Sequence, residues 1–379
     1  MKQYDVIIIG AGPAGLSTAL HLQQMAPELA ERTLILEKER HPRPKICAGG
    51  VLRDGVRLLA NLGLDIQDVP RIPIRCVHFG LEDRGLTDVE KDYFLGFYTV
   101  LREDLDGWMA SKARERGLTL LEATPVRQVL TSRSGVEVVT PSGTYQAQIV
   151  VGADGARSVV RRAIEGTRKP RYARAIQVWA PPSPGSPHRE DGVYFDFQCI
   201  RWGIPGYIWD FPAPVRGQQM RCWGVYDSNR IPAGEKRRLA GVLTERLGFY
   251  GYSETFPMYG GVIHHFYPNN VFAAPRVLLV GDAAGVDVLF GEGISPALGY
   301  GKLAARAIVE AFARKDFSFQ QYGQQVLKSS LGQMLARRLR IASVLYRIQA
   351  LGLQRWIWWR LTQVVRWSIR RIVDWADRL

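Results

Sequence analysis

The clearest hydrophobic pattern lies at the start of the chain. Residues 6–9 are uninterrupted Val and Ile, which is typical of a short strand buried on both faces of a parallel sheet. A glycine-rich turn, a helical pattern over residues 14–24 and a second apolar run at Thr33–Leu36 follow. This order predicts a β-α-β unit, with which a Rossmann-like α/β domain begins.

The rest of the chain alternates between two kinds of pattern. We expect helices at residues 52–62 and 101–117, and strands at residues 118–122, 126–131, 135–140 and 148–151. Residues 171–266 carry Tyr, Trp and Phe at alternating positions between Pro and Gly, which predicts an antiparallel sheet. A buried strand at 277–280, a glycine-rich loop and a helix ending near residue 313 come next, and the remainder is helical in period.

These patterns predict a mixed α/β (α+β) protein whose two domains interleave. A chain of 379 residues exceeds the commonest size of a single core. We expect a discontinuous nucleotide-binding domain, an antiparallel-sheet substrate domain inserted into it, and a C-terminal segment of basic amphipathic helices. Their limits are 1–75, 101–170 and 271–320 for the first, 76–100 and 171–270 for the second, and 321–379 for the third.

The glycine-rich turn has the GxGxxG spacing, with Gly10, Gly12 and Gly15 between a strand and a helix. In such a loop the first glycine permits the tight turn, the second lets the backbone approach a pyrophosphate, and the third lets helix and strand pack closely. The helix N-terminus then faces the phosphate charge. Glu37 ends the second strand at the spacing of a ribose-binding acid. A turn that binds nothing is the alternative, but strand, helix and acid in register favour a dinucleotide.

Two later segments also place an acid beside a glycine after a strand: Asp154-Gly155 and Gly281-Asp282. With Arg102 ahead of a helix, they resemble the DG motif, the GD motif and the FAD-contacting arginine of the flavoprotein family of aromatic hydroxylases and geranylgeranyl reductases, which share the p-hydroxybenzoate hydroxylase fold. In that family the GD aspartate holds the ribityl chain of FAD and the DG motif lies near the flavin. The resemblance extends over about residues 4–320 and implies FAD as the cofactor.

Three other segments resemble the geranylgeranyl reductase branch of that family. Residues 44–51, which contain Cys47, are similar to its PxxxCGGG segment, residues 206–212 to its YxWxFP signature, and residues 291–294 to its GEGI loop. Ala48 replaces a glycine of the pattern, and the loop before Gly291 lacks the expected proline. Hydroxylases commonly carry His where Gly285 stands, which favours the reductase branch.

The resemblance assigns a role to each matching residue. The residues expected to contact FAD are Gly10, Gly12, Pro13, Ala14, Gly15, Glu37, Lys38, Lys45, Arg102, Asp154, Gly281, Asp282, Gly291, Gly293 and Ile294. Tyr207, Trp209 and Phe211 share one face of a predicted strand and either wall a cavity for a long apolar substrate or belong to plain core. Cys47 is the candidate catalytic residue, expected to tune the active site or position substrate, with an inert small side chain as the alternative.

Other candidate chemistry is sparse. The four cysteines stand far apart without a CxxC pair or a histidine at metal-ligand spacing, so we expect reduced thiols and no metal site. His264 and His265 are proton-donor candidates by residue type alone, and we expect one to be exposed and the other to pack. Only five residues precede the first strand, so we expect no secretory or transit peptide, and no apolar run is long enough for a transmembrane helix.

The net charge of +14 is concentrated in the tail. Residues 331–379 hold ten arginines against Asp374 and Asp377, a surplus of +8. The sequence predicts a helix with an apolar face of Ile357, Leu361, Val364, Val365, Ile372 and Trp375, opposite Arg360, Arg366, Arg370, Arg371 and Arg378, with Trp356, Trp359 and Trp367 among the arginines. Such a helix fits either an anionic membrane surface or the body of the protein. Nucleic acid is disfavoured, because no motif for it accompanies the charge.

The function that these observations favour is reduction of carbon–carbon double bonds in an isoprenoid or other lipid-like substrate by an FAD-dependent oxidoreductase. NAD(P)H or a reduced electron carrier such as ferredoxin would be the donor, binding transiently, since the chain has no second GxGxxG unit. An FAD-dependent monooxygenase or hydroxylase of the same fold is the rival, and a non-catalytic flavin-bearing protein at a membrane is a weaker alternative. We expect a cytoplasmic protein, with a peripheral position at the inner face of the membrane left open by the tail.

Overall fold

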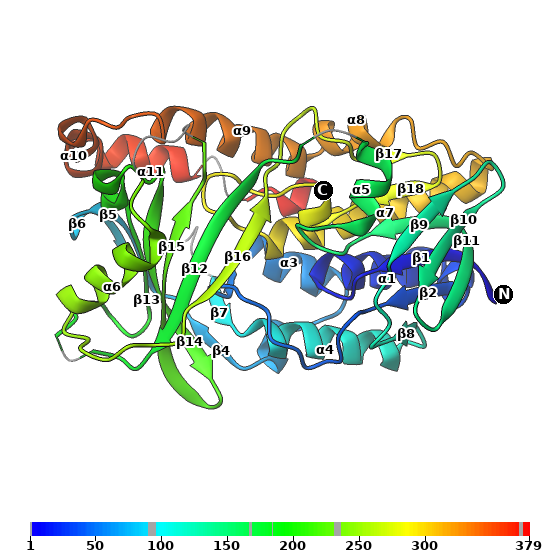
Figure 1. Ribbon diagram of the computed structural model, residues 1–379, viewed down its shortest axis with the longest axis horizontal. Coiled ribbons are helices and arrows are strands. Elements are labelled where there is room, and N and C mark those ends of the chain that lie inside the picture. Colours follow the sequence, from blue (N-terminus) through cyan, green and yellow to red (C-terminus); the bar gives the residue numbers. More distant parts are fainter. Residues whose placement is uncertain (1, 90–95, 167–168, 184, 231–235, 371–373) are drawn as a thin grey trace.

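The computed structural model describes residues 2–89, 96–166, 169–183, 185–230, 236–370 and 374–379. Two large sheets lie at opposite ends of the molecule, and long helices run between and alongside them (Figure 1). In the described part of the chain, no helix combines the length and the hydropathy that a membrane crossing requires.

The first sheet has eight strands and forms around the N-terminal strand. Its order is β17 (Ala273–Ala274), β18 (Val277–Leu279), β11 (Gly143–Gly152), β1 (Lys2–Ile9), β2 (Thr33–Leu36) and β8 (Thr119–Leu121). In addition, β10 (Val136–Thr140) pairs with β11, and β9 (Gln128–Thr131) pairs with β10. Strands β18, β11, β1, β2 and β8 pair in parallel. The predicted β-α-β start is confirmed, and the strand expected at 148–151 is the end of a longer one.

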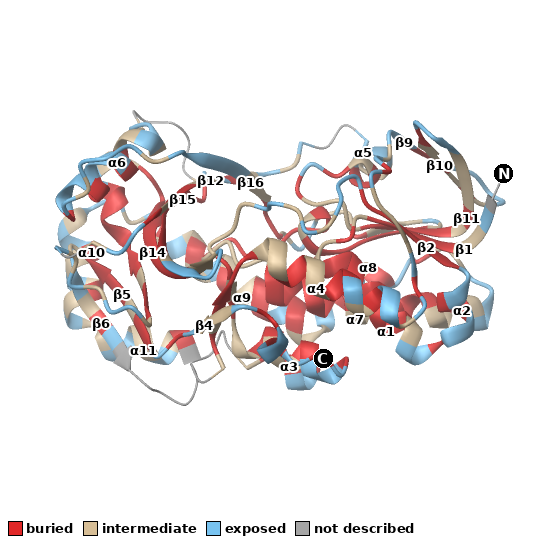
Figure 2. Cartoon of the chain, turned by 90° about the horizontal axis from the view of Figure 1, so that it is seen from below, coloured by how far each residue is buried: buried red, intermediate tan, exposed pale blue. Residues whose placement is uncertain are grey.

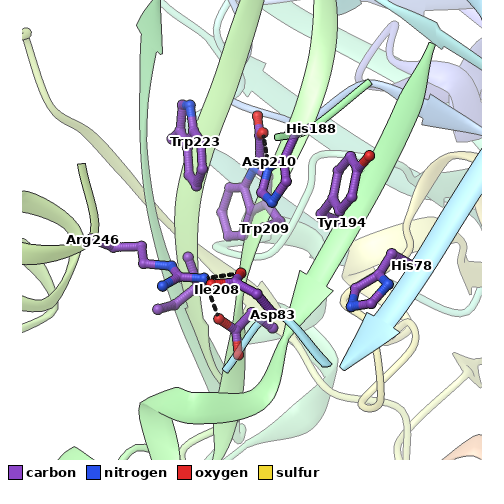
Figure 3. Close-up of a pocket in the computed structure, with 10 residues that line it drawn as sticks. His78, Asp83, His188, Tyr194, Ile208, Trp209, Asp210, Trp223 and Arg246 are labelled. Atoms are coloured by element: carbon purple, nitrogen blue, oxygen red, sulfur yellow. Dashed lines mark hydrogen bonds and ion pairs between the residues drawn. The ribbon is translucent and has the colours of Figure 1, made fainter. Parts of the chain in front are cut away.

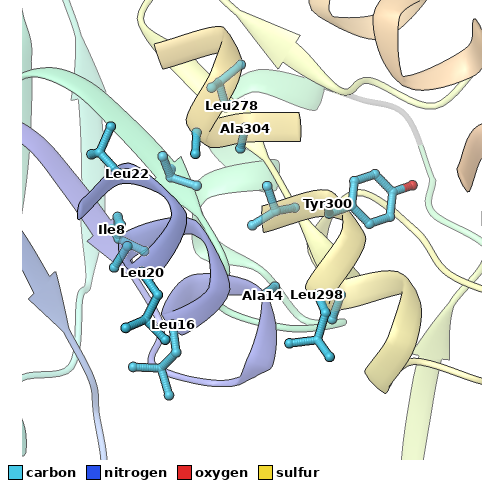
Figure 4. Packing of buried hydrophobic residues seen from close by; sticks show 14 of the residues in the cluster. Ile8, Ala14, Leu16, Leu20, Leu22, Leu278, Leu298, Tyr300 and Ala304 are labelled. Atoms are coloured by element: carbon cyan, nitrogen blue, oxygen red, sulfur yellow. The ribbon is translucent and has the colours of Figure 1, made fainter. Parts of the chain in front are cut away.

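Helices cover this sheet and supply its core. They are α1 (Pro13–Met25), α2 (Pro27–Glu31), α3 (Arg53–Asn61), α4 (Arg102–Glu115), α5 (Val159–Glu165) and α7 (Ile294–Arg314). Helices α1 and α7 pack against each other with Leu16, Leu20, Leu298 and Tyr300 buried between them and the sheet (Figure 4). A Cβ on Gly301 would lie 2.4 Å from the hydroxyl of Ser17, so the two helices approach closely because this position has no side chain.

The second sheet has seven strands. Its order is β16 (Tyr259–His264), β12 (Tyr172–Ala180), β15 (Gln218–Asp227), β14 (Gly206–Val215), β13 (Gly192–Asp196), β5 (Cys76–Leu81) and β6 (Arg84–Val89). The expectation of a purely antiparallel sheet is wrong at one place, because β13 pairs with β5 in parallel. These two strands are joined through the nucleotide-binding half rather than by a hairpin, so no short turn fixes their relative direction. Helix α6 (Leu239–Phe249) also interrupts the strands.

A small sheet joins the two large ones. It consists of β3 (Gly50–Val51), β7 (Tyr98–Val100) and β4 (Arg71–Pro73). Short 3₁₀ helices occur at Ile66–Asp68, Phe197–Trp202, Gly281–Ala283 and Ala376–Arg378. The sheets thus draw their strands from the segments expected of two interleaved domains, while the exact domain limits stay a prediction.

The C-terminal region is helical as predicted, but it is not one amphipathic helix. It comprises α8 (Tyr322–Lys328), α9 (Ser330–Leu345), α10 (Leu351–Arg360) and α11 (Thr362–Arg370). The helix breaks at Leu361, and α10 and α11 both lie along β5 and β6 (Figure 1). Packing against the sheet overrides the continuous helical period, because Trp358 is buried with its ring stacked on Phe197, 4.1 Å between centroids.

The set of residues predicted to form the apolar face of the tail is therefore wrong. Val364 is exposed, and Trp375 is buried in a separate turn, while Ile372 and Arg371 lie outside the described residues. The chain end is fastened to α3, where the carboxylate of Asp54 accepts hydrogen bonds from the backbone N–H groups of residues 374, 375 and 376 at 2.8–3.0 Å. Figure 2 shows buried residues where helices and sheets pack against each other and exposed residues at the periphery of the molecule.

Candidate active site

The glycine-rich turn is shaped by backbone contacts that exclude side chains. Gly10 has a φ of +106°, and a Cβ there would lie 2.4 Å from the carbonyl oxygen of Ala153. A Cβ on Gly15 would lie 1.9 Å from the carbonyl oxygen of Gly10. These two positions have the roles predicted for them, a tight turn and close helix–strand packing.

Gly12 faces an open space lined by positive charge. A Cβ there would lie 3.6 Å from a guanidinium nitrogen of Arg43 and 3.7 Å from one of Arg102. Gly12 is also the N-cap of α1, and within the described residues no side chain caps the first turn of this helix. Backbone N–H groups and two guanidinium groups thus surround a site that suits a pyrophosphate. Pro13 and Ala14, in the first turn of α1, are buried beside it.

Glu37 has the position of a ribose-binding acid. Its carboxylate is buried at the end of β2 and accepts hydrogen bonds from the N–H groups of Ala11 at 2.8 Å and Glu39 at 3.1 Å. Arg43, which the sequence analysis missed, lies 3.3 Å from this carboxylate. By contrast, the predicted contact residues Lys38 and Lys45 are both exposed.

Arg102 begins α4 and is held rigidly. Its guanidinium makes two hydrogen bonds of 2.8 Å to the carboxylate of Asp106, one turn later in the helix. Burial opposes the charge on Arg102, but the neighbouring Asp106 raises the pKa of Arg102 above its ordinary value. The guanidinium therefore stays charged beside Gly12. The i, i+4 spacing of Arg and Asp was the sequence signal for this pair.

The acids of the DG and GD motifs, Asp154 and Asp282, have different partners in the structure. The carboxylate of Asp154 caps α5 by accepting from the N–H of Val159 at 2.6 Å, while its Oδ1 is buried without a hydrogen-bond partner among the described residues. Burial raises the pKa of Asp154. Asp282 lies at the start of the loop toward α7, beside Gly293, whose Cβ would come within 3.4 Å of its Oδ1. Burial also raises the pKa of Asp282, opposed by the charges of Lys45 and Arg102.

The flavin-loop segment, residues 287–290, is held by three tyrosines. The hydroxyl groups of Tyr226, Tyr346 and Tyr207 donate to three consecutive carbonyl oxygens, those of residues 288, 289 and 290 respectively. Burial raises the pKa of each of these tyrosines well above 10, so all three remain protonated donors. Side-chain hydrogen bonds thus hold this loop, which lacks the proline expected from the resemblance.

Buried charges support the same loop from the other side. The carboxylate of Asp287 accepts from the N–H groups of Leu289 at 2.8 Å and Phe290 at 3.1 Å. Arg338 of α9 makes an ion pair of 3.0 Å with Asp287 and a second one with Glu292. The sequence analysis did not identify Asp287, Arg338 or the tyrosine contacts.

The aromatic residues of β14 lie as the period of two predicts. Tyr207, Trp209 and Phe211 belong to one apolar cluster, whereas Ile208 on the opposite face packs in another with α6. The first cluster contains residues 288–290 of the flavin-loop segment and borders Ala48. A Cβ on Gly50 would lie 3.6 Å from the ring of Phe211, so the cysteine-bearing loop also reaches this face.

Cys47 is half-buried at this junction. Its thiol is free and accepts a hydrogen bond of 3.3 Å from the N–H of Gly49. Arg102 and Tyr207 are both close enough to interact with it electrostatically. The structure therefore brings together the phosphate loop, the cysteine loop, the GD and GEGI loops and the aromatic face of β14.

Neither histidine that was considered as a proton donor is exposed, which corrects the expectation that one of them would be. His264 and His265 are both 2 % exposed. Burial lowers the pKa of His264 to about 4 and that of His265 to about 3, so both are neutral near pH 7. His264 lies within 3.1 Å of the carbonyl oxygen of Asp282. Both histidines therefore pack in the protein interior at the edge of the second sheet and are not accessible to solvent.

A small polar cavity is lined by Ile208 and Asp210, which lie on the opposite face of β14, and also by Trp209 (Figure 3). His188 stacks on Tyr194 there, 3.7 Å between ring centroids, and is 2.7 Å from Asp210, while Arg246 pairs with Asp83 and Asp196. The cavity holds only about 10 Å³, room for about one water molecule. It is too small for a substrate and lies away from the loops described above.

Comparisons with known proteins identify an FAD-binding domain and related reductases. A family described as FAD binding domain matches residues 3–191. Digeranylgeranylglycerophospholipid reductase 1 of Methanococcoides burtonii is 26 % identical over 91 % of this chain and 85 % of its own length. Menaquinone reductase of Mycolicibacterium smegmatis is 29 % identical over 79 % of this chain and 75 % of its own length.

Solved structures of the same fold include both kinds of enzyme weighed above. A geranylgeranyl bacteriochlorophyll reductase-like protein of Thermoplasma acidophilum superposes with a TM-score of 0.79 at 21 % identity, covering 100 % of this chain and 97 % of its own. A probable FAD-dependent monooxygenase of Pseudomonas aeruginosa gives a TM-score of 0.69 at 18 % identity, covering 93 % and 99 %. At these identities the likeness establishes the fold.

Proposed function

This chain belongs to the FAD-dependent oxidoreductases, and from that premise we propose that it reduces carbon–carbon double bonds of an isoprenoid lipid. The relatives' names support a lipid substrate, since one of them is a reductase of digeranylgeranylglycerophospholipid, a lipid whose name specifies geranylgeranyl chains. The observation that carries the proposal is the contact between the aromatic face of β14 and the flavin-loop segment, made by the hydroxyl of Tyr207 and the carbonyl of Phe290.

The residues around Gly12 fit FAD. Backbone N–H groups of α1 and the guanidinium groups of Arg43 and Arg102 would neutralise its pyrophosphate, and the buried carboxylate of Glu37 would accept from a ribose hydroxyl. The unpartnered oxygen of Asp154 is available to a polar group of the cofactor. The full set that we propose is Gly10, Gly12, Pro13, Ala14, Gly15, Glu37, Lys38, Lys45, Arg102, Asp154, Gly281, Asp282, Gly291, Gly293 and Ile294.

The chain's own contribution to the reaction would be a dry, preorganised apolar environment at the aromatic face of β14. Bound, reduced FAD would supply the hydride for one alkene carbon, and a proton donor would supply the hydrogen for the other. An isolated alkene has no oxygen that a hydrogen-bond donor could polarise, so water must be excluded and the double bond oriented. The buried rings of Tyr207, Trp209 and Phe211 would hold the apolar chain, and we propose that Cys47 positions the reacting segment at the mouth of the cysteine loop.

The electron donor is part of the same proposal. We propose that NAD(P)H, or a reduced electron carrier, binds transiently near the cofactor, because the chain contains a single GxGxxG loop. Stopped-flow mixing of the oxidised holoprotein with NADPH, NADH or reduced ferredoxin would identify the donor from the rate of flavin bleaching. Failure of all three would contradict this part alone.

The monooxygenase is the second candidate, favoured by the fold it shares with the Pseudomonas aeruginosa protein. One experiment separates the two. The holoprotein is reduced without oxygen and mixed with a geranylgeranyl-bearing lipid, while the flavin spectrum and the product mass are followed. Anaerobic reoxidation with a gain of about one H₂ per double bond supports the reductase. Reoxidation only in air, with one oxygen atom gained, would establish the monooxygenase instead.

We propose further that the protein docks peripherally on the inner face of an anionic membrane. The exposed large apolar residues of its last helices and their connections are Val344, Leu353, Trp356, Val364 and Trp367. Residues 317–373 contain ten Lys and Arg and no Asp or Glu, and Arg340, Arg347 and Arg360 are exposed among them. Interfacial tryptophans beside exposed arginines suit anionic lipid headgroups.

Vesicle sedimentation tests the docking. The protein should sediment with phosphatidylglycerol-containing vesicles and not with phosphatidylcholine alone, and binding should weaken with salt. A variant with Trp356→Ser and Trp367→Ser should lose binding. Phe249→Ser, at an exposed aromatic residue of α6, is the matched control and should bind normally. Equal sedimentation of all three proteins would contradict a role for this surface.

A further inference from the structure

Helix α9 connects the two halves of the molecule. Leu331, Met334 and Leu335 near its start belong to the core of the eight-stranded sheet, whereas Ala342 and Tyr346 near its end belong to the apolar cluster of β14. In Figure 1 it runs along one edge of the molecule from one sheet toward the other. The sequence resemblance ends at about residue 320, before this helix, so nothing in the motifs points to a role at the active site.

One stripe of α9 faces the flavin-loop segment. Arg338, Ala342 and Tyr346 are spaced four residues apart, and all three are buried. Arg338 binds the carboxylates of Asp287, the first residue of the segment, and of Glu292, two residues beyond its end. The hydroxyl of Tyr346 donates a hydrogen bond to the carbonyl oxygen of residue 289, which lies between these two acids in the chain.

These contacts constrain the loop at five of its backbone groups. The carbonyl oxygens of residues 288–290 accept from tyrosines, and the N–H groups of Leu289 and Phe290 donate to Asp287. The orientation of Asp287 in turn depends on Arg338. A buried polar group that loses its hydrogen-bond partner costs free energy of folding. Alternative loop conformations would leave several such groups without partners, so this conformation is favoured.

We propose that Arg338 and Tyr346 are positioning residues of the FAD site, which makes the C-terminal helix α9 part of the active centre. They fix the path from Asp287 to Glu292 and so the approach of Gly291 and Gly293, two residues assigned to FAD, toward Asp282. The inference rests on the FAD site of the proposed function. It adds a requirement for side chains that lie outside the family's motifs and touch neither cofactor nor substrate.

A purely structural role makes a different prediction. If Arg338 only balances the buried charges of Asp287 and Glu292, its loss would lower stability without changing the environment of the flavin. The pair of Arg221 and Asp210 is a matched comparison. It is equally buried, joined at 2.8 Å, and lies on the face of β14 that points away from the flavin-loop segment.

The experiment compares holoproteins carrying Arg338→Met, Tyr346→Phe or Arg221→Met with the wild type. We measure thermal stability, the FAD dissociation constant, the visible spectrum of the bound flavin and its midpoint potential. Arg338→Met should raise the FAD dissociation constant about tenfold, which is about 1.4 kcal/mol, and shift the spectrum and the potential. Tyr346→Phe should shift them in the same direction by less. Arg221→Met should lower stability alone.

The outcomes separate this inference from the proposed function. If Arg338→Met and Tyr346→Phe leave the dissociation constant, spectrum and potential at wild-type values, the inference is overturned. Should Arg338→Met fail to fold, Tyr346→Phe decides, since it removes a single hydroxyl from the same stripe. A wild-type protein that binds no FAD would overturn the proposed function instead.

Discussion

The two ends of the molecule are built for recognition in different ways. At the eight-stranded sheet the candidate contacts are backbone groups and charges, and glycines create the space around them. At the seven-stranded sheet they are large aromatic side chains on one face of β14. The motifs of the first site lie in nearby residues and are visible in the sequence. At the second site a period of two shows which aromatic side chains share a face, but what that face contacts depends on which segments become neighbours and emerges only from the fold.

The largest expected effect is at the backbone-built end. Gly10→Val should abolish FAD binding, because the new Cβ would overlap the carbonyl oxygen of Ala153 at a φ that disfavours side chains. FAD content of the purified protein is the measurement. Gly248→Ala, in α6 with nothing within 4 Å, is the control and should leave FAD content unchanged. A Gly10→Val protein with full FAD content would refute the contact.

Acid should destabilise both ends. Burial lowers the pKa of His21, His78 and His264 to about 4 and that of His265 to about 3, below the ordinary 6.5. Protonation therefore favours the unfolded chain, and the free energy of unfolding should fall as pH drops from about 6.5 toward 4, with each pKa unit worth up to about 1.4 kcal/mol. Asp196, whose pKa burial raises to about 6, acts in the opposite direction, as do Asp154 and Asp282, whose pKa values burial also raises. These carboxyl groups make the fall shallower than the four histidines alone would give.

Urea unfolding at pH 7.5, 5.5 and 4.5 measures this dependence. His265→Gln should flatten it, because the largest of the four shifts is then absent. Stability that stays level or rises between pH 6.5 and 4.5 would show that these histidines become protonated within the folded protein.

The two faces of β14 allow a sharper comparison. Phe211→Ala and Ile208→Ala should each cost about 2–5 kcal/mol of stability, since both remove buried side chains from the same strand. Only Phe211→Ala should reduce turnover of a lipid substrate, and neither should change the FAD dissociation constant. Equal losses of turnover in both variants would mean that the aromatic face is ordinary core.

A smaller effect is expected at Glu37. Glu37→Gln should weaken FAD binding about tenfold, because hydrogen bonds to a charged group contribute about 1.5–3 kcal/mol and the amide retains part of this. Fluorescence titration with FAD gives the constant. Asp65→Asn removes a carboxylate that accepts a backbone hydrogen bond of 2.9 Å far from the loops, and its FAD affinity should equal the wild type's.

The extent of successful sequence-based prediction follows the same division. The β-α-β start, Gly10, Gly15 and the shared face of Tyr207, Trp209 and Phe211 follow from local periods and spacings, and the structure has them as predicted. Local patterns contain no information on distant partners, so Asp287, Arg338 and the tyrosine contacts were missed. Their partners lie more than forty residues away in the chain.

The tail shows the converse error. A helical period over residues 355–379 predicted one continuous amphipathic helix, but the chain breaks at Leu361 and buries Trp358 and Trp375 at separate places. The period correctly indicated helices. It could not indicate that β5 and β6 would offer a surface on which two short helices pack better than one long helix.

The attachment of residues 374–376 to Asp54 has a consequence for protein synthesis. The first β-α-β unit leaves the ribosome more than three hundred residues before Trp375, which packs against Gly299 of α7. Until Trp375 has been translated, the surfaces of α3 and α7 that it covers stay exposed to solvent and to chaperones. The nucleotide-binding half is therefore completed only when the C-terminal region joins it, and a nascent chain that ends before Trp375 would present this half unfinished.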